Sequence, residues 1–297
     1  MSPMEVNTTY EPFSREPEYI EANREFLKTL DLRAVKILLD LACGTGTITE
    51  LLLEQYPEVR TVVGLDLSRE SLLLAKEDLV ANGKLAGPDG DEPFNEEPRT
   101  TLLLTEGTAD VLPLLPVFFD AVLMGNSIHL LTDVDQLLEE VHRVLKPGGP
   151  FAFNSSFYAG TMTPGTEKFY HQWIGHAAAY IKYKDEELRK QGKEGIKRKR
   201  GTARQAFSNR WLSKQEWNEA LTRHGFKLVS MYERTVMMNQ RCFETIGAYA
   251  GLASVLFSGY PVEISSEALQ VMAGPALKAV NMESVPRLYL EVSAQKA

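Results

Sequence analysis

The chain has 297 residues and is 44% hydrophobic, which is enough to bury a large core in one domain with insertions. Its formal net charge of −8 argues against a general nucleic-acid-binding protein, because such proteins normally carry a basic surface. No apolar run approaches the about 20 residues of a membrane span, and the polar, acidic start has no apolar signal segment. The two cysteines, Cys43 and Cys242, are too few for a disulfide framework or a metal cluster. We therefore expect a cytoplasmic protein without a metal ion.

Short aliphatic runs and amphipathic segments alternate through the first half of the chain. A helix is predicted at 17–30, within an N-terminal segment (1–34) that precedes the alternation. The aliphatic runs predict buried strands at 35–41, 61–66, 100–104, 119–124 and 150–154. The segments between them predict helices at 47–56, 68–82 and 133–145, and a Gly- and Pro-rich loop at 83–99. This alternation predicts an α/β fold for residues 35–154, with a mostly parallel sheet and helices on both faces.

The pattern changes after residue 154. Residues 155–212 predict a helical insertion that includes a basic segment, Lys182 to Arg204, with ten Lys/Arg and four Asp/Glu. This segment is either a solvated helix end or a site for an anionic group. Residues 213–297 predict a return to the core, with strands at 226–236 and 287–294 around a second, mainly helical insertion at about 237–284. We therefore expect seven strands and a helical cap built from the two insertions.

A glycine-containing turn follows the first predicted strand, in the sequence ILLDLACGTGTITELL (37–52). Glycine lets the backbone approach a ligand closely, and the helix that follows presents free N–H groups. A phosphate-binding P-loop is excluded because this turn contains no lysine. A dinucleotide-binding motif would need a third glycine where this chain has Thr49.

This turn resembles the first motif of the class I S-adenosylmethionine-dependent methyltransferases, an acid-x-Gly-x-Gly-x-Gly sequence in which Ala42 replaces the first glycine. The resemblance continues in three later segments: TEGTADVLPL (105–114), FDAVLMGNSIHLLTD (119–133) and RVLKPGGPFAF (143–153). It covers residues 35–154, and less specifically the two strands predicted after residue 225. The resemblance implies a Rossmann-like fold, with residues 35–154 as the part that binds S-adenosylmethionine.

The resemblance also implies which residues contact the cofactor. Asp40 is expected near its ammonium group, and Asp66, at the end of the second predicted strand, near both ribose hydroxyls. Either aspartate could instead cap the turn or helix that follows it. The other implied contacts lie in the turn, around the adenine and after the fourth strand: Ala42, Cys43, Gly44, Gly46, Leu67, Thr108, Ala109 and Asn126.

Thr108 departs from the family motif, and Cys43 brings a thiol group into the turn. Thr108 stands where the family usually has an aspartate, so the adenine amino group loses a hydrogen bond worth about 1–3 kcal/mol unless Asp110 compensates. We expect weaker adenine recognition, not a loss of cofactor binding. Cys43 is expected to be a small hinge residue and not a nucleophile, because nothing basic lies near it in the sequence.

Methyl transfer needs mainly alignment of the reactants, and a base only where the acceptor loses a proton. His129, after the fourth predicted strand, is a candidate for that base or for positioning the acceptor, or it is a structural histidine. Glu167 and His171 are four residues apart and share a predicted helix face, either as a base with its orienting partner or as a solvent-facing pair. A second stripe on that helix could be core or could line an acceptor pocket: Phe169, Trp173, His176 and Tyr180.

The N-terminal segment contains Tyr10 and Phe13. Small-molecule members of the family often fold such a segment over the cofactor, with an aromatic ring beside the sulfonium, which would place Tyr10 in the cofactor site. The other interpretation is an ordinary packing contact between these aromatic residues and the first helix.

We therefore predict an S-adenosylmethionine-dependent methyltransferase of small molecules. The largely apolar residues 237–264 favour a lipophilic acceptor, such as an aromatic, polyketide, fatty or isoprenoid compound, and the basic segment could hold an anionic end. A nucleic-acid partner is not expected, because Asn126-Ser127-Ile128-His129 lacks the paired prolines of amino-methylating enzymes. We expect a monomer or a homodimer. The alternatives are a protein or nucleic-acid methyltransferase, a cofactor-binding sensor or non-transferase, and a nicotinamide oxidoreductase.

Overall fold

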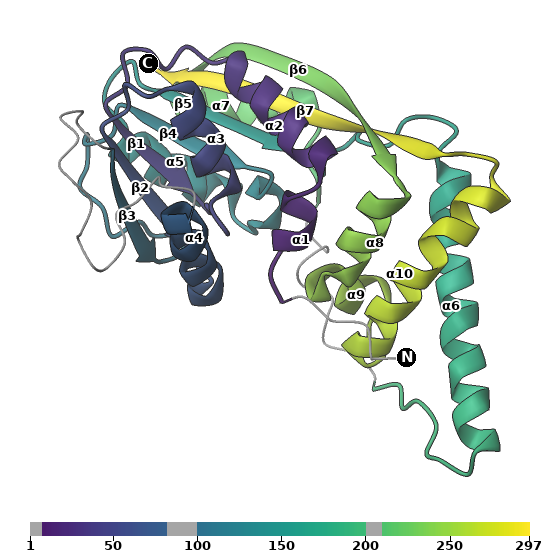
Figure 1. The fold of residues 1–297 in the computed structure, drawn as a ribbon. Coiled ribbons are helices and arrows are strands. Elements are labelled where there is room, and N and C mark those ends of the chain that lie inside the picture. The colour runs from purple at the N-terminus through teal and green to yellow at the C-terminus, as the bar shows by residue number, and fades with distance from the viewer. Residues whose placement is uncertain (1–7, 82–99, 200–209) are drawn as a thin grey trace. The chain divides into compact units, whose positions relative to one another are not determined.

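The computed structural model describes residues 8–81, 100–199 and 210–297 (Figure 1). The predicted loop at 83–99 and the end of the basic segment, from Arg200 to Arg204, lie outside these residues. The chain divides into two compact units. We call one the core unit; it comprises Ile20–Thr161, Trp211–Arg234 and Tyr289–Ala297. We call the other the helical unit; it comprises Met1–Tyr19, Met162–Arg210 and Thr235–Leu288.

The described residues form a seven-stranded sheet with the order β3-β2-β1-β4-β5-β7-β6. Its strands are β1 (Ile37–Leu41), β2 (Thr61–Asp66), β3 (Thr101–Glu106), β4 (Ala121–Gly125), β5 (Pro150–Ser155), β6 (Phe226–Asn239) and β7 (Ser284–Lys296). The first five strands pair in parallel, and β7 runs antiparallel to β5. The boundary between the two units falls within β6 and within β7. The predicted mostly parallel, Rossmann-like sheet is confirmed.

Helices cover both faces of this sheet. The core unit contains most of α2 (Pro17–Lys28), and all of α3 (Thr47–Gln55), α4 (Arg69–Ala81), η1 (Ile128–Leu130), α5 (Val134–Val144) and α7 (Lys214–Arg223). Ala152 of β5 packs in a buried cluster with residues of α2 and α3. Its neighbours Phe151 and Phe153 point to the opposite face, where the Phe153 ring lies 4.8 Å from Trp217 of α7. The expected two-sided packing is confirmed.

Side-chain caps mark the starts of two helices in the core unit. The Ser213 hydroxyl accepts from the backbone N–H of Glu216 at 3.3 Å, and the Glu216 side chain accepts from the backbone N–H of Ser213 at 2.8 Å, which is a complete capping box for α7. Ser68 accepts from the backbone N–H of Ser71 at 3.2 Å at the start of α4. Each cap satisfies a donor that the helix itself leaves without a partner.

The helical unit is built around an aromatic core. It contains α1 (Glu11–Ser14), α6 (Glu167–Lys190), α8 (Gln240–Ala248), α9 (Ala250–Leu256) and α10 (Val262–Ala279). The Phe243 ring of α8 lies 4.4 Å from Phe169 and 5.1 Å from Trp173 of α6. The Trp173 indole donates to the Leu269 carbonyl of α10 at 2.8 Å. This part of the predicted aromatic stripe is therefore core. None of the helices in the described segments is both long and apolar enough to cross a membrane.

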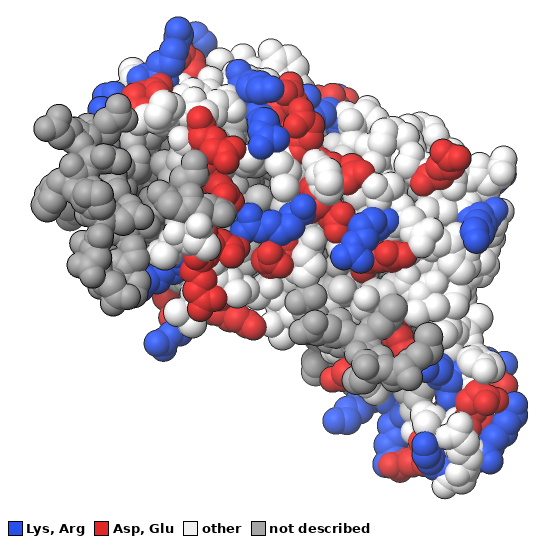
Figure 2. All heavy atoms as spheres, viewed as in Figure 1, with Lys and Arg blue, Asp and Glu red and all other residues white. Residues whose placement is uncertain are grey.

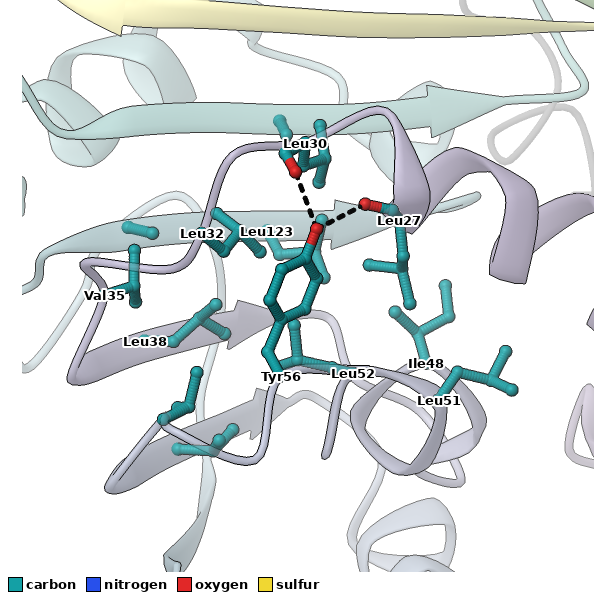
Figure 3. Packing of buried hydrophobic residues seen from close by; sticks show 14 of the residues in the cluster. Leu27, Leu30, Leu32, Val35, Leu38, Ile48, Leu51, Leu52, Tyr56 and Leu123 are labelled. Atoms are coloured by element: carbon teal, nitrogen blue, oxygen red, sulfur yellow. Dashed lines mark hydrogen bonds between the residues drawn. The ribbon is translucent and has the colours of Figure 1, made fainter. Parts of the chain in front are cut away.

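A buried tyrosine holds the end of α2 against the rest of the core unit (Figure 3). The Tyr56 hydroxyl is 2.8 Å from the carbonyl of Leu27 and 2.6 Å from that of Leu30, at the end of α2. The Leu27 carbonyl also accepts from the backbone N–H of Leu30 at 3.0 Å. The tyrosine proton is therefore needed most by the Leu30 carbonyl, which lies beyond the last turn of the helix, where carbonyls have no partners within the helix. The ring itself packs among aliphatic residues of α2, α3 and β1.

We predict that Tyr56→Phe lowers the free energy of unfolding by about 1–3 kcal/mol, because it removes the hydrogen bond from the tyrosine hydroxyl to the buried Leu30 carbonyl. Urea unfolding followed by circular dichroism measures this change. Tyr183→Phe is the matched control, because Tyr183 is 56% exposed. Equal unfolding midpoints for the two variants would show that the Tyr56 hydroxyl does not hold α2.

Candidate functional site

The strand order reverses between β1 and β4. The chain winds outward from β1 through β2 to β3 on one side, and from β4 to β5 on the other. In open α/β sheets, ligands bind beyond the carboxyl ends of the strands at such a reversal. Asp40 lies at the end of β1, Asp66 at the end of β2, and Asn126 directly after β4. The structure therefore brings these three predicted residues to one edge of the sheet.

The turn after β1 has an unusual backbone. Ala42, Gly44 and Gly46 have φ angles of +57°, +55° and +81°. Glycine adopts this left-handed conformation freely, whereas another residue pays about 1–2 kcal/mol. Ala42 therefore holds a strained conformation at the position where the family motif has its first glycine. The turn ends where α3 begins, at Thr47.

Asp66 ties this turn to β2. The backbone N–H of Gly44 donates to Asp66 Oδ2 at 2.8 Å, and the backbone N–H of Ser68 donates to Asp66 Oδ1 at 2.8 Å. The second contact is the capping role that the sequence left open, and the first places the carboxylate against the turn. Each carboxylate oxygen has a further lone pair, so Asp66 can still accept from ligand hydroxyl groups.

Asp40 is a buried carboxyl group at the start of the same turn. It is 1% exposed, and its Oδ2 accepts from the Thr49 hydroxyl of α3. Its Oδ1 is buried and has no hydrogen-bond partner in the structure. Burial raises the pKa of Asp40 to about 7, against the opposing effect of the Thr49 hydrogen bond; the negative charge of Asp66 adds to the rise. A cationic donor would satisfy the free oxygen and favour the ionised form.

The segment after β3 carries the predicted adenine contacts. Thr108 is exposed and Ala109 is buried. The Thr108 hydroxyl lies 3.3 Å from Asp110 Oδ2, while Asp110 Oδ1 is buried and has no partner within the described segments. A carboxylate oxygen is thus available two residues beyond the position where the family usually has its aspartate. Leu67, predicted to face the adenine, is 75% exposed in this structure.

A charged pair on α5 fixes the chain beyond Asp110. Arg143 donates to the carbonyls of Leu112 and Leu114 at 2.9 and 2.8 Å, and Glu140 accepts from the backbone N–H of Leu112 at 2.7 Å. The hydrogen bond from Arg143 holds the pKa of Glu140 below its usual range, so the pair stays ionised. This pair was not predicted, although its three-residue spacing on a predicted amphipathic helix was a usable signal.

A network of buried amides shapes the end of β4. Asn126 has a φ of +43°, and its backbone N–H donates to Asn154 Oδ1 at 2.8 Å. Asn154 Nδ2 donates to Asn23 Oδ1 at 2.8 Å, and Asn126 Oδ1 accepts from the backbone N–H of Ser156 at 2.8 Å. The adjacent Ser127 hydroxyl is buried without a hydrogen-bond partner. Asn23, Asn154 and Ser156 belong to no motif, so they could not be predicted from the sequence.

His129 lies in η1, just beyond this network. It is half-buried, and its Nδ1 is 3.1 Å from Ser155 Oγ at the end of β5. Its ring centroid is 4.4 Å from that of Phe157, which is 5.3 Å from that of Trp211. The Trp211 indole nitrogen is buried and has no hydrogen-bond partner among the residues that the structure describes. Ser155, Phe157 and Trp211 were not predicted, because they come from segments distant in the sequence.

The other predicted site residues lie in the helical unit. Glu167 and His171 are exposed on α6, and Glu167 Oε2 accepts from the backbone N–H of Gly165 at 2.8 Å. Tyr10 packs edge-to-face against Phe13 at 5.1 Å and Tyr249 at 5.5 Å. Their exposure favours the solvent-facing alternative for Glu167 and His171, and the ring contacts favour the packing alternative for Tyr10.

Cys43 has the environment of a structural thiol. It is buried, and burial raises the pKa of its thiol well above the usual value, with further increases from the nearby carboxylates of Asp40 and Asp66. The thiolate is the nucleophilic form of cysteine. A neutral, buried thiol therefore fits the predicted hinge role.

The described part of the basic segment carries both signs of charge. Figure 2 shows blue and red atoms mixed at the lower right, where α6 ends in Figure 1. A hollow of about 490 Å³ there is lined by Lys184 and Lys197 but also by Glu187, Glu194 and Glu263. Three carboxylates beside two ammonium groups do not favour an anionic ligand. The charges thus support the solvated interpretation of this segment.

Comparison with known proteins agrees with this geometry. Residues 39–153 match the family model of a methyltransferase domain. A demethylmenaquinone methyltransferase from Lactobacillus johnsonii is 34% identical over 126 residues, which is 42% of this chain and 46% of the relative. A ubiquinone/menaquinone biosynthesis C-methyltransferase from Brucella anthropi is 29% identical over 143 residues, 48% of each protein.

The fold similarity extends further than the sequence similarity. A proposed methyltransferase from Bacillus halodurans has a TM-score of 0.55 and 15% identity, with 93% of this chain and 99% of that one covered. In sequence, however, the chain spans about half the length of the relatives it matches. The match to a methyltransferase domain at residues 39–153 therefore agrees with the resemblance of the glycine turn and the three later motifs, all of which lie within this range.

Proposed function

We propose that the protein transfers a methyl group from S-adenosylmethionine to a small lipophilic acceptor. The observation that carries this proposal is the turn after β1, which lies between two carboxyl groups and has no lysine. A phosphate ligand would be repelled there, whereas a cation with ribose hydroxyls suits both carboxyl groups. The buried, unpartnered oxygen of Asp40 is a polar group that such a ligand would satisfy.

Residues of this chain are placed to bind each part of S-adenosylmethionine: its ammonium group, its ribose and its adenine. Asp40 would hold the ammonium group and Asp66 the two ribose hydroxyls, while the exposed Leu67 side chain would cover the adenine. Asp110 Oδ1, buried without a partner, would accept from the adenine amino group in place of the missing aspartate at Thr108. Backbone N–H groups at the start of α3 would lie close to the cofactor, because the turn permits close approach.

The bound cofactor supplies a methyl group activated by a positively charged sulfur. The chain then has to align the acceptor with that methyl group and exclude water. The residues placed to do this are those beyond β4 and β5, where His129, Phe157 and Trp211 form a row of rings. Glu167 and His171 remain a predicted pair of base and orienting partner.

The nature of the acceptor is inferred from two observations. The ring row, together with a buried indole N–H, suits a flat aromatic molecule with an oxygen substituent. The two relatives named above carry the names of quinone-biosynthesis enzymes. We therefore propose an aromatic, lipophilic acceptor of the naphthoquinol type.

We expect S-adenosylhomocysteine and a methylated product to form in equal amounts when the protein is mixed with S-adenosylmethionine and a 1,4-naphthoquinol that carries a short prenyl chain. Mass spectrometry of both products checks this. A sensor or non-transferase would instead bind S-adenosylhomocysteine but form none. Binding without turnover across a panel of quinols, phenols and fatty acids would contradict the proposed activity.

Asp66→Asn is expected to weaken S-adenosylhomocysteine binding by about 10- to 100-fold, because the ribose hydroxyls lose a charged acceptor. The amide oxygen can still accept from Gly44, so the turn should remain ordered. Isothermal titration calorimetry gives the two dissociation constants. Glu77→Gln, which removes an exposed carboxylate on the neighbouring helix α4, serves as the matched control and should bind like the wild type.

Affinity for S-adenosylhomocysteine should rise about tenfold between pH 6 and pH 8 and then level off. Below a pKa of about 7 the Asp40 carboxyl group is largely protonated and neutral, so binding of the ammonium group must release a proton. Above that pKa the carboxylate is already charged. Calorimetry in a pH series measures the change, and Asp40→Asn should abolish it. An equal slope in both proteins would assign the pH dependence to another group.

A further inference from the structure

The Ser155 hydroxyl has a complete set of hydrogen-bond partners. Its oxygen is 3.0 Å from the carbonyl oxygen of Phe157, 3.0 Å from the backbone nitrogen of Phe157 and 3.1 Å from His129 Nδ1. Ser155 is fully buried at the end of β5, next to β4, from which the chain leads into η1 and His129. The contacts therefore join the carboxyl ends of two neighbouring strands.

The chemistry of these partners fixes the direction of each hydrogen bond. A carbonyl oxygen can only accept, so the single hydroxyl proton of Ser155 goes to Phe157. The backbone N–H of Phe157 uses one lone pair of Ser155 Oγ. The remaining contact must then be a donation from His129 to the second lone pair, which requires a proton on Nδ1. In a neutral imidazole the other nitrogen, Nε2, then carries the lone pair.

We propose that Ser155 is a positioning residue that holds the neutral His129 imidazole with its proton on Nδ1, so that Nε2 serves as the proton acceptor during methyl transfer. This inference rests on the proposed function and adds a role for a buried serine that no motif contains. It also selects among the sequence interpretations of His129: the side chain is a base, and its contact with Ser155 sets its tautomer.

The step balances without another reactant. The electron pair of the acceptor forms the new bond to the methyl carbon, and the electron pair of the broken carbon–sulfur bond stays on sulfur. The proton that the acceptor loses passes to His129 Nε2, and the resulting imidazolium releases it to water. The Phe157 ring, 4.4 Å from the imidazole, restricts rotation of the imidazole and gives a flat acceptor a surface to lie against.

Nitrogen-15 NMR of the histidine side chains at pH 8 tests the tautomer directly, because protonated and unprotonated ring nitrogens have well-separated shifts. The chain has five histidines, and His129→Gln assigns the signal by its disappearance. The wild type should show a protonated Nδ1 and an unprotonated Nε2. In Ser155→Ala the proton should move largely to Nε2, the form favoured by an unrestrained imidazole. Ser293→Ala, which removes another buried hydroxyl from β7, should leave the pattern unchanged.

A wild-type spectrum with the proton on Nε2 overturns the proposal, whether or not the protein binds the cofactor. This result needs no variant, so it stands even if Ser155→Ala fails to fold. An unchanged tautomer in a folded Ser155→Ala variant also overturns it.

Kinetics with the naphthoquinol tests the positioning role of Ser155 separately from the proposed function. Ser155→Ala should lower kcat about 10- to 100-fold, which is less than the about 100- to 10,000-fold that a positioned base contributes, because the imidazole remains and loses only its fixed tautomer. The dissociation constant of S-adenosylhomocysteine should stay within about twofold. A purely structural role would weaken cofactor binding and kcat together, and that outcome contradicts the proposal. Absence of turnover in the wild type would instead count against the proposed acceptor, while the NMR result would still decide the tautomer.

Discussion

The hydrogen bond from the Gly44 N–H to the Asp66 carboxylate is the contact on which the site depends. It joins the turn after β1 to the end of β2 at 2.8 Å. The turn contains three residues with left-handed backbone conformations, and at Ala42 this conformation costs free energy. A strained turn persists only where its surroundings hold it. Asp66 therefore fixes the backbone of this turn, and in the proposed cofactor site its charge would also select the ligand.

Much of the fold and half of the site could be predicted because the signals are local. The strands of the core unit are short aliphatic runs, and Asp40, the turn and Asp66 lie within thirty residues of each other. Asn154 and Asn23 could not be found in this way, because their hydrogen bond joins residues 131 positions apart. Ser155 is likewise 26 residues from His129. Such pairs are created by strand order, and strand order is a property of the whole fold.

The helical insertions show a second limit of prediction from sequence. Hydrophobic periodicity identified the α6 stripe correctly, but it could not distinguish core from pocket. Phe169 and Trp173 proved to pack against Phe243, which lies about seventy residues further along the chain. Periodicity tells which side chains share a face of a helix, and not what that face meets. The same limit applied to Glu167 and His171, whose shared face is exposed.

The family match includes the proposed cofactor site but not the residues that surround His129. Cofactor binding depends on backbone geometry at strand ends, which tolerates little change, and the match to the family model covers those strand ends at 39–153. His129 lies inside this range, but Ser155, Phe157 and Trp211, which surround it, lie beyond it. The family motif therefore cannot specify what His129 does. In the proposed mechanism its chemistry is set by the tautomer that Ser155 imposes, so a change of one side chain at the end of β5 would alter the reaction while leaving the cofactor site intact.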